Sequence, residues 1–565
     1  MQRPWHASYP SGMPREIDPS RYPSVTDLFD EAWQRYGERS FAVCMDRFIT
    51  YAELERASAT FGAWLQSLGL HEGARVAVML PNVLQFPVVT AAILRAGLVA
   101  VPVNPLYTAR ELEHQLRDSG ADVVIVLENF AAVLEQALRA APVRHVVVCT
   151  MGDLLGYAKG ALVNFAVRKV KKLVPAFSLP AAVSFREAMA AGRASRFAQV
   201  RAAPGDIAFL QYTGGTTGLS KGAILTHRNV VAAMLQFEAS FDAVESTLYQ
   251  DNPTLSPVAQ YNVVTALPLY HIYALSACAL AAMRRGSLLT LVPNPRDIAG
   301  FVKELAKRPF HTFPGLNTLF LALAANEDFR KLDFSQLRLT GAGGMATNPA
   351  VAARWKQLTG CVVREGWGMS ETCAAGTTNS ARIDAHTGTI GLPLPSVDLA
   401  VRDENNRDLA TGEAGELCIK GPNVTPGYYN RPDETANALT PDGYLRTGDI
   451  GTMDERGYFR IVDRKKDMII VSGFNVFPSE VEAVVGAHPG VLECAAVGVA
   501  DDETGEAVRL FVVRRDAALD EGAVRDYCRE RLTGYKRPKQ VVFRDELPKT
   551  PVGKVLRRAL REPSE

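Results

Sequence analysis

Cysteine is scarce in this chain, and no two cysteines form a C-x-x-C pair. Eight cysteines are spread over 565 residues, too few and too scattered for a zinc ribbon or a disulfide framework. We therefore expect buried, reduced thiols in a cytoplasmic protein. The beginning, MQRPWHASYPSGMPREIDP, has no apolar run after its first basic residue, so we expect no secretory signal.

A strong charge of either sign is also missing. The chain has 62 Lys and Arg against 61 Asp and Glu, a formal net charge of +1. Binding to a phosphate backbone needs an excess of basic residues on one face, so nucleic acid is not expected as the main partner. A composition of 47% hydrophobic and 22% charged residues excludes wholesale disorder. The length predicts two to four structural units.

An uninterrupted membrane span is not expected either. Residues 262–283 carry no formal charge, but they include Pro268, His271 and many small side chains. We favour a buried helix entered through a turn over a membrane span.

The first half of the chain alternates between helix and strand patterns. Capping-box pairs at Thr50 with Glu53 and at Thr108 with Glu111 open apolar-periodic stretches. Strand patterns such as ARVAVML and ADVVIVL follow them. This alternation predicts an α/β fold, with a large N-terminal domain of two helix-covered sheets.

The residue composition and the predicted elements change toward the end of the chain. Glycines, prolines and short strands predict a β-rich subdomain over about 388–462, inside an N-terminal domain of 1–465. A small α+β domain is predicted over 466–565, with a helix capped by Ser479 and Glu482.

The stretch YTGGTTGLSKG, from Tyr212 to Gly222, has the chemistry of a phosphate-binding loop. Glycines let backbone N–H groups converge on an anion, hydroxyl groups bind phosphate oxygens or Mg²⁺, and Lys221 adds a positive charge. We expect a strand (DIAFLQYT) before it and a helix (AILTHRNVVAAML) after it. It is not a Walker A loop, because Ser220 precedes the lysine and a glycine follows it.

Four later features are weaker when taken singly. GAGGMA, from Gly341, lacks the last glycine of a dinucleotide fingerprint. Glu371 in EGWGMSET suits Mg²⁺, although a solvated loop glutamate gives the same pattern. Asp449 in GYLRTGD suits ribose hydroxyls, and Lys554 lies in a tight Pro/Gly turn before a basic helix.

Five stretches of the chain resemble, in their order, the motifs of the adenylate-forming superfamily. They are YTGGTTGLSKG, GWGMSET, YLRTGD, DRKKDMIIVSGFN and PVGKVLRR. That superfamily contains acyl-CoA synthetases, firefly luciferase and peptide-synthetase adenylation domains, and the resemblance covers essentially the whole chain. Three further segments are similar to segments of the bacterial long-chain fatty acyl-CoA synthetases of β-oxidation: VNPLYTARELEHQLRDSGA, ALPLYHIYAL and FRDELPK. The resemblance implies two steps: a fatty acid and MgATP form acyl-adenylate and pyrophosphate, and coenzyme A then displaces AMP.

The resemblance also implies roles for individual residues. Mg²⁺ is assigned to Thr213 and Glu371, and the ribose hydroxyls to Asp449 and Arg464. The β- and γ-phosphates are assigned to Thr213, Gly214, Gly215, Thr216, Thr217, Gly218, Ser220 and Lys221. The adenine and α-phosphate are assigned to Gly343, Gly344, Glu365, Gly366, Trp367, Gly368 and Thr372.

The remaining implied roles concern chemistry and motion. Lys554 would bridge the acyl carboxylate and the α-phosphate, and His271 would lie beside that carboxylate. The small C-terminal domain of this family rotates between the two steps, with Lys466 at the hinge position. After rotation, a loop would line the coenzyme A tunnel through Ser472, Gly473 and Phe474.

Two departures from the near relatives concern the acyl pocket. Trp367 stands where those relatives usually carry tyrosine, and CAAGTTNS after Glu371 is smaller and more polar than expected. The ATP chemistry should survive both changes. Medium-chain, branched or aromatic acids therefore remain alternative substrates, as do a non-catalytic binder and an acyl donor to a carrier protein.

The segment 160–177, GALVNFAVRKVKKLVPAF, predicts a basic amphipathic helix. Such a helix can lie on an anionic membrane, which would place the protein peripherally on the inner face of the cell membrane. A surface helix packed on its own domain gives the same pattern. The relatives are often homodimers, but nothing in the sequence marks an interface. The predicted apolar face holds Leu162, Val163, Ala166, Val170, Leu173 and Val174, opposite Arg168, Lys171 and Lys172.

Overall fold

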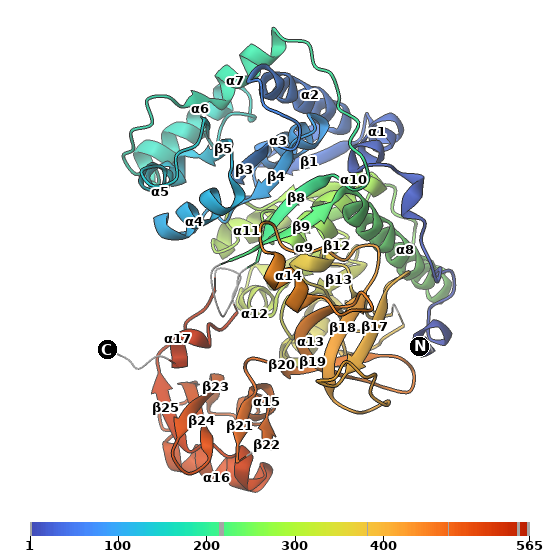
Figure 1. Cartoon of the computed structure of the whole chain (residues 1–565), viewed down its shortest axis with the longest axis vertical. Coiled ribbons are helices and arrows are strands. Elements are labelled where there is room, and N and C mark those ends of the chain that lie inside the picture. The colour runs from blue at the N-terminus through green and yellow to red at the C-terminus, as the bar shows by residue number, and fades with distance from the viewer. Residues whose placement is uncertain (1–2, 214–219, 381, 473, 551–553, 562–565) are drawn as a thin grey trace.

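The computed structural model describes residues 3–213, 220–380, 382–472, 474–550 and 554–561. Two large sheets covered by helices form the body, and a small domain of helices and strands hangs below it (Figure 1). The α/β fold predicted for the chain, with its two helix-covered sheets, is confirmed.

The seven-stranded sheet has the order β7-β6-β5-β3-β4-β8-β9, and all its pairings are parallel except that of β8 with β9. Its strands are β3 (Arg75–Met79), β4 (Val99–Pro102), β5 (Val123–Leu127), β6 (His145–Cys149), β7 (Val183–Ser184), β8 (Ile207–Tyr212) and β9 (Gly222–Thr226). The helices around it are α2 (Tyr51–Ser67), α3 (Gln85–Arg95), α4 (Ala109–Ser119), α5 (Ala131–Leu138), α6 (Tyr157–Phe165) and α7 (Phe185–Arg193).

The nine-stranded sheet has the order β16-β15-β14-β13-β12-β10-β11-β1-β2. Its strands are β1 (Ser40–Cys44), β2 (Arg47–Thr50), β10 (Asn262–Thr265), β11 (Leu288–Leu291), β12 (Thr312–Gly315), β13 (Leu339–Ala342), β14 (Val363–Trp367), β15 (Thr377–Thr378) and β16 (Leu392–Pro393). Its helices are α1 (Val25–Tyr36), α8 (His227–Asp251), α9 (Ile272–Ala274), the π-helical Leu275–Leu280, α10 (Ala281–Arg285), α11 (Ile298–Leu305), α12 (Asn317–Ala325) and α13 (Pro349–Thr359).

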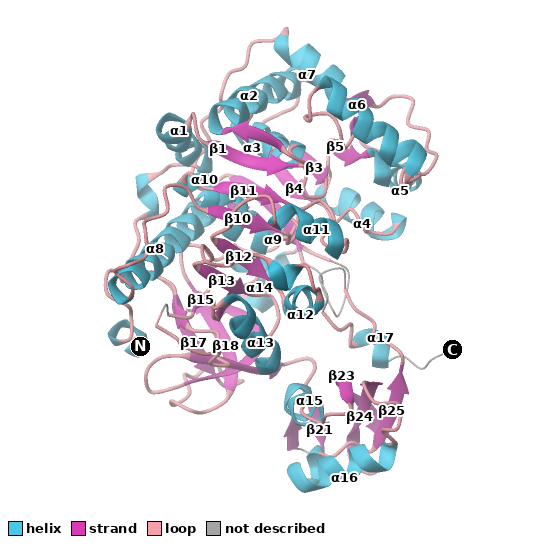
Figure 2. Cartoon of the chain, turned by 180° about the vertical axis from the view of Figure 1, so that it is seen from behind, coloured by secondary structure: helices cyan, strands magenta, loops and turns pink. Residues whose placement is uncertain are grey.

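Two smaller sheets complete the chain, and the connection between them runs from β20 to β21 (Figure 2). The four-stranded sheet consists of β17 (Asp398–Arg402), β18 (Gly415–Lys420), β19 (Leu445–Met453) and β20 (Phe459–Arg464), with α14 (Pro432–Ala438) beside it. The last domain consists of β21 (Ile469–Val471), β22 (Phe474–Val476), β23 (Val491–Asp501), β24 (Gly505–Arg514), β25 (Gln540–Arg544), α15 (Pro478–Gly486), α16 (Glu521–Arg531) and α17 (Arg558–Arg561).

Local capping signals place several helices where the sequence predicts them. The Thr50 hydroxyl accepts from the Glu53 N–H at 3.0 Å, and α2 begins at the next residue. A second capping box, at Thr108 and Glu111, opens α4. Both helices start there because a side-chain oxygen satisfies a backbone N–H that has no partner within the helix.

The helix predicted directly after the glycine-rich loop is wrong in its first part. Residues Gly222–Thr226 form β9, which pairs antiparallel with β8. The helix α8 begins only at His227, where Thr226 and Asn229 form a capping box. The loop therefore joins two strands of a hairpin. The alternation of GAILT fits a strand edge better than a helix face.

The cap predicted for α15 is also wrong. The helix begins at Pro478, one residue before Ser479, and the Ser479 hydroxyl donates to the Asp463 carboxylate at 2.7 Å. Glu482 pairs with Arg557 at 2.7 Å. Both side chains bond to residues outside α15 and not to each other's backbone, so they do not form a local capping box.

Residues 262–283 combine a strand with a helix. β10 takes the first four residues, and the helical stretch begins at Ile272, after a turn that contains Pro268. No described helix of the chain is long and apolar enough to cross a membrane.

Candidate active site

A cavity of about 2140 Å³ opens at the carboxyl ends of the central strands of the nine-stranded sheet. This edge of a parallel sheet is where α/β proteins usually bind ligands. The C-terminal domain contributes Lys554 to the wall of this cavity. Three sheets thus contribute predicted site residues to one cavity.

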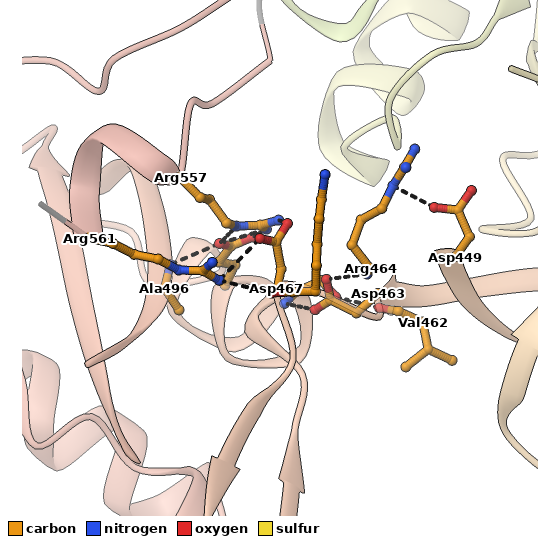
Figure 3. A network of polar contacts seen from close by, with 11 residues as sticks. Asp449, Val462, Asp463, Arg464, Asp467, Ala496, Arg557 and Arg561 are labelled. Carbon is orange, nitrogen blue, oxygen red and sulfur yellow. Dashed lines mark hydrogen bonds and ion pairs between the residues drawn. The ribbon is translucent and has the colours of Figure 1, made fainter. Parts of the chain in front are cut away.

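Asp449 lies on β19 and is almost completely buried at the cavity wall. Its carboxylate accepts from the Trp367 indole N–H at 2.8 Å. It also pairs with the Arg464 Nε at 2.5 Å, as Figure 3 shows. Burial raises the pKa of this carboxyl, while Arg464 and the Trp367 hydrogen bond oppose the rise. Trp367, the departure from the near relatives, therefore orients a predicted ribose-binding group.

Glu371 lies in a short 3₁₀ turn and is also buried. The Tyr428 hydroxyl donates to its carboxylate at 2.8 Å. Burial raises the pKa of Glu371, and the Tyr428 hydrogen bond and nearby Arg464 and Lys221 oppose the rise. A bound cation would favour the carboxylate form in the same way.

The donors present fit Mg²⁺. Glu371 and Thr213 both line the cavity and supply oxygen atoms, and Mg²⁺ is typically held by one or two carboxylates together with substrate phosphates. Within the described ranges, no group of three or more His, Cys, Asp or Glu side chains could hold a metal ion. The ion would therefore depend on the nucleotide for its other ligands.

The glycine-rich loop begins and ends at the cavity. The Thr213 N–H donates to the Lys221 carbonyl at 2.9 Å, which closes the hairpin. The Lys221 ammonium pairs with Glu434 and lies 5.2 Å from the centre of the Tyr428 ring. The predicted phosphate ligands Gly214, Gly215, Thr216, Thr217 and Gly218 lie outside the described residues, whereas Ser220 lines the cavity.

The two other glycine-rich turns bring the backbone close to the cavity. Gly344 follows β13 with φ of +79°, a conformation that favours glycine. A Cβ on Gly368 would lie 2.2 Å from the Ala374 carbonyl oxygen, so only glycine fits there. Gly343 and Gly366 line the same wall. At Gly366 and Gly368, neighbouring backbone takes up the space of a side chain, so these two positions hold the wall together.

Glu365 and Thr372 have structural partners in this wall. The Glu365 carboxylate accepts from the Thr347 N–H at 2.5 Å and from His386 at 2.9 Å. The Thr372 hydroxyl bonds to the backbone of Met369 and thereby holds the turn that carries Glu371. Glu365 lines the cavity, and Thr372 is not among the described lining residues.

Lys554 lines the cavity and is tied to Thr550 by two hydrogen bonds. The Thr550 N–H donates to the Lys554 carbonyl at 2.7 Å, and the Lys554 N–H donates to the Thr550 hydroxyl at 3.1 Å. Burial lowers the pKa of Lys554 to about 8; Arg464 and Lys466 add to the effect, and Asp449 opposes it. The protonated Lys554 side chain is thus destabilised by its surroundings in the free protein. Anionic substrates bound in the cavity would stabilise it.

His271 lies at the start of α9, on the same cavity wall. Its Nδ1 accepts from the Tyr273 N–H at 3.3 Å, so in the neutral ring Nε2 carries the proton. Burial, together with the nearby Lys554, lowers the pKa of His271 to about 4. The ring is therefore neutral at physiological pH and offers one N–H donor.

The residues predicted for coenzyme A do not share this location. Lys466 lines the cavity, but Ser472 and Phe474 are not among its described lining residues. Phe474 is 56% exposed and stacks on Tyr535, with ring centroids 4.7 Å apart. Gly473 lies outside the described residues. The present orientation of the C-terminal domain thus presents Lys554 and not this loop to the cavity.

Polar contacts hold the C-terminal domain in that orientation (Figure 3). Asp463, on β20, accepts from the Ser479 N–H at 2.8 Å, in the first turn of α15. A carboxylate from one domain thus caps a helix of the other. Within the C-terminal domain itself, Arg557, three residues after Lys554, pairs with Glu482 at 2.7 Å and with Asp467 at 3.2 Å, which fixes the segment that follows Lys554.

Sequence reasoning missed several partners of the predicted residues. Asp449 is 82 positions from its partner Trp367, and Tyr428 is 57 positions from its partner Glu371. No local sequence pattern connects residues so far apart. For Asp467 and Arg557, the available signal was the charge cluster DRKKD and the basic stretch after Lys554.

Comparisons with known proteins agree with this geometry. The AMP-binding enzyme family matches residues 29–429, and the AMP-binding enzyme C-terminal domain matches residues 480–554. The chain belongs to the AMP-binding enzyme family.

Three similar proteins illustrate the match. The long-chain-fatty-acid–CoA ligase of Salmonella typhimurium is 51% identical over 563 residues, covering 100% of this chain and 98% of the relative. The enzyme of the same name from Bacillus subtilis is 34% identical, covering 99% and 98%. The crystal structure of ATP-bound MatB from Rhodopseudomonas palustris superposes with a TM-score of 0.78 at 28% identity, covering 95% of this chain and 98% of that one.

Proposed function

We propose that this protein is an ATP-dependent long-chain fatty acid–CoA ligase. One observation carries the proposal: the buried ammonium of Lys554 lies in one cavity with His271, Glu371 and Asp449. The names of the similar ligases and their identity over the full chain support the choice of fatty acids and coenzyme A as substrates.

In the first half-reaction, an oxygen of the fatty acid carboxylate attacks the α-phosphorus of ATP, and pyrophosphate leaves. Both reactants are anionic, so catalysis depends on positioning and on neutralising charge. Lys554 would hold the carboxylate against the α-phosphate, and the His271 N–H would donate to one of these anions. Asp449 would fix the ribose. Thr213 and Glu371 would hold Mg²⁺, which would neutralise the leaving pyrophosphate.

In the second half-reaction, the coenzyme A thiol attacks the acyl carbon and AMP leaves. We propose that the C-terminal domain first turns about Lys466, which removes Lys554 from the cavity and brings in the loop of Ser472, Gly473 and Phe474. The exposure of Phe474 in the present orientation supports this order. Such domain closure is a common gating step in enzymes.

The acyl chain would occupy an apolar arm of the cavity. Leu339 and Gly341 on β13, and Thr312 and Pro314 on β12, line this arm in alternation, so they share one face of the sheet. The arm therefore runs from the nucleotide end toward the amino ends of the strands.

Purified protein should release pyrophosphate and form acyl-CoA when given MgATP, coenzyme A and straight-chain acids, with a maximum at long chains. A maximum at medium-chain, branched or aromatic acids would keep the mechanism and replace the substrate. Without coenzyme A, a ligase stops after the adenylate. An acyl donor to a carrier protein would make adenylate but no acyl-CoA, and a non-catalytic binder would release no pyrophosphate.

The pKa of Lys554 predicts the pH dependence of adenylation. The ammonium form is the active one, so kcat/KM for pyrophosphate release should fall as the pH rises past about 8. Because a guanidinium stays protonated, a Lys554→Arg enzyme should lose this fall, even at a lower rate. The same alkaline fall in the arginine variant would show that another group titrates.

We propose further that residues around α6 attach the protein peripherally to the inner face of the cell membrane. The predicted helix over 160–177 is shorter: α6 and a π-helical turn end at Val170, and Lys172 has φ of +50°. The predicted apolar face is also divided, since Val163 packs on the core while Leu162 and Val170 are each 68% exposed; Phe165, outside the predicted face, is 59% exposed.

The exposed surface of this segment mixes apolar and basic groups. Val170 and Leu173 are exposed as well, and Lys169, Lys171 and Lys172 are exposed beside them. Exposed apolar side chains among lysines suit the boundary of an anionic bilayer. A homodimer stays a prediction.

Replacing Leu162 and Phe165 by serine should weaken binding to vesicles that contain anionic lipid by about tenfold or more, since each buried side chain contributes roughly 1.5–3 kcal/mol. Vesicle co-sedimentation measures this. Leu492→Ser is the matched control, because Leu492 is 51% exposed in the C-terminal domain. Equal binding by the double variant and the wild type would contradict the proposal.

A further inference from the structure

A helical stretch lines the apolar arm of the cavity with small side chains, and a large side chain follows them. Ala277, Ala281 and Arg285 all line the arm and follow one another at intervals of four residues. They lie on the continuous helical stretch from α9 to α10. Two small side chains thus leave space along the helix, and a large charged one occupies the next turn.

Aromatic and apolar residues of α8, which packs beside this helical stretch, also line the cavity. Phe237, Phe241 and Val244 line the cavity at positions i, i+4 and i+7, the spacing of one helix face. Phe241 contacts Arg285 of α10, with the guanidinium carbon 4.0 Å from the ring centre. This contact joins the two helical walls at one point.

Further contacts fix this closing pair. The Arg285 guanidinium pairs with Asp242 and, at 3.1 Å, with Glu245. The Tyr261 hydroxyl donates to Glu245 at 2.7 Å, and its ring meets Phe241 edge-on at 4.9 Å. A methyl terminus pushed between these groups would separate the Arg285 guanidinium, whose side chain is 16% exposed, from the 25% exposed Glu245 without offering either a new partner, which is unfavourable.

We infer that the Phe241–Arg285 pair closes the acyl arm and thereby sets the longest fatty acid that the enzyme accepts, while Ala277 and Ala281 keep the arm open up to that point. This inference rests on the proposed function. His271, where the carboxylate would lie, is 14 positions before Arg285, so the helix gives the arm a length of about 20 Å at 1.5 Å per residue. An extended long-chain fatty acid is of comparable length.

Two substitutions with opposite effects test the inference. Ala281→Phe should lower kcat/KM for long-chain acids by about 100-fold, because methylenes that no longer fit cost roughly 10- to 200-fold each. Octanoate should lose much less, because its chain ends before position 281, so the ratio of kcat/KM between long-chain acids and octanoate is the readout. Phe241→Ala should extend the range, raising kcat/KM by about tenfold for the first chain length that the wild type rejects.

The outcomes separate this inference from the proposed function. If the wild type makes no acyl-CoA from any acid, the proposed function fails. If the wild type is active and neither variant changes the ratio between long and short acids, the closing pair is wrong and the proposed function stands. Should Ala281→Phe fail to fold, Phe241→Ala alone decides, since an unchanged upper limit would overturn the inference.

Discussion

Lys554→Ala should lower the rate of adenylate formation by about 10²–10³, the cost of removing one preorganised charge that stabilises a transition state. Lys554 lies on the cavity wall beside Asp449 and His271, and burial already lowers its pKa to about 8. The protein therefore holds this cation where it is disfavoured without substrate. Pyrophosphate release under single-turnover conditions measures the effect.

The second half-reaction provides the control for this variant. Thioester formation from acyl-adenylate supplied in advance should change little, because Lys554 would have left the cavity before that step. Lys539→Ala is a matched control in the same domain, since Lys539 pairs with Asp501 at 2.8 Å and does not line the cavity. A folded Lys554→Ala enzyme that adenylates at the normal rate would refute the role of Lys554.

Lys466→Pro should impair thioester formation more than adenylation, by at least about tenfold, which corresponds to about 1.4 kcal/mol in the barrier. Lys466 lies in the turn between β20 and β21, where the Asp467 N–H donates to the Arg464 carbonyl at 3.0 Å. Proline fixes φ at this position and restricts rotation of the domain. Rotation must also break the bonds between Asp463 and Ser479.

Lys466→Ala separates the backbone effect from that of the lost charge. Alanine removes the ammonium that lines the cavity but leaves the backbone free, so the ratio of the two half-reactions should stay closer to that of the wild type. Both rates are measured separately, with adenylate supplied for the second. An equal loss of both half-reactions in Lys466→Pro would place the hinge elsewhere.

Several features of the molecule follow from the sequence alone. The capping boxes at Thr50 and Thr108 and the alternation of helices and strands depend on residues a few positions apart, so they predicted the α/β body correctly. The local pattern gave a wrong prediction where a short segment fitted both the helix period and the strand period. Gly222–Thr226 forms a strand because it pairs with β8, and that partner decides between strand and helix.

For the candidate site too, some features could be predicted from the sequence and others could not. The ordered motifs identified the family and named Lys554, Glu371 and Asp449, because phosphate chemistry constrains residue types within short segments. The sequence did not show that Trp367 contacts Asp449, that Asp463 caps α15, or that Phe241 contacts Arg285. Each of these pairs joins segments from different elements, so only the tertiary packing brings their side chains together.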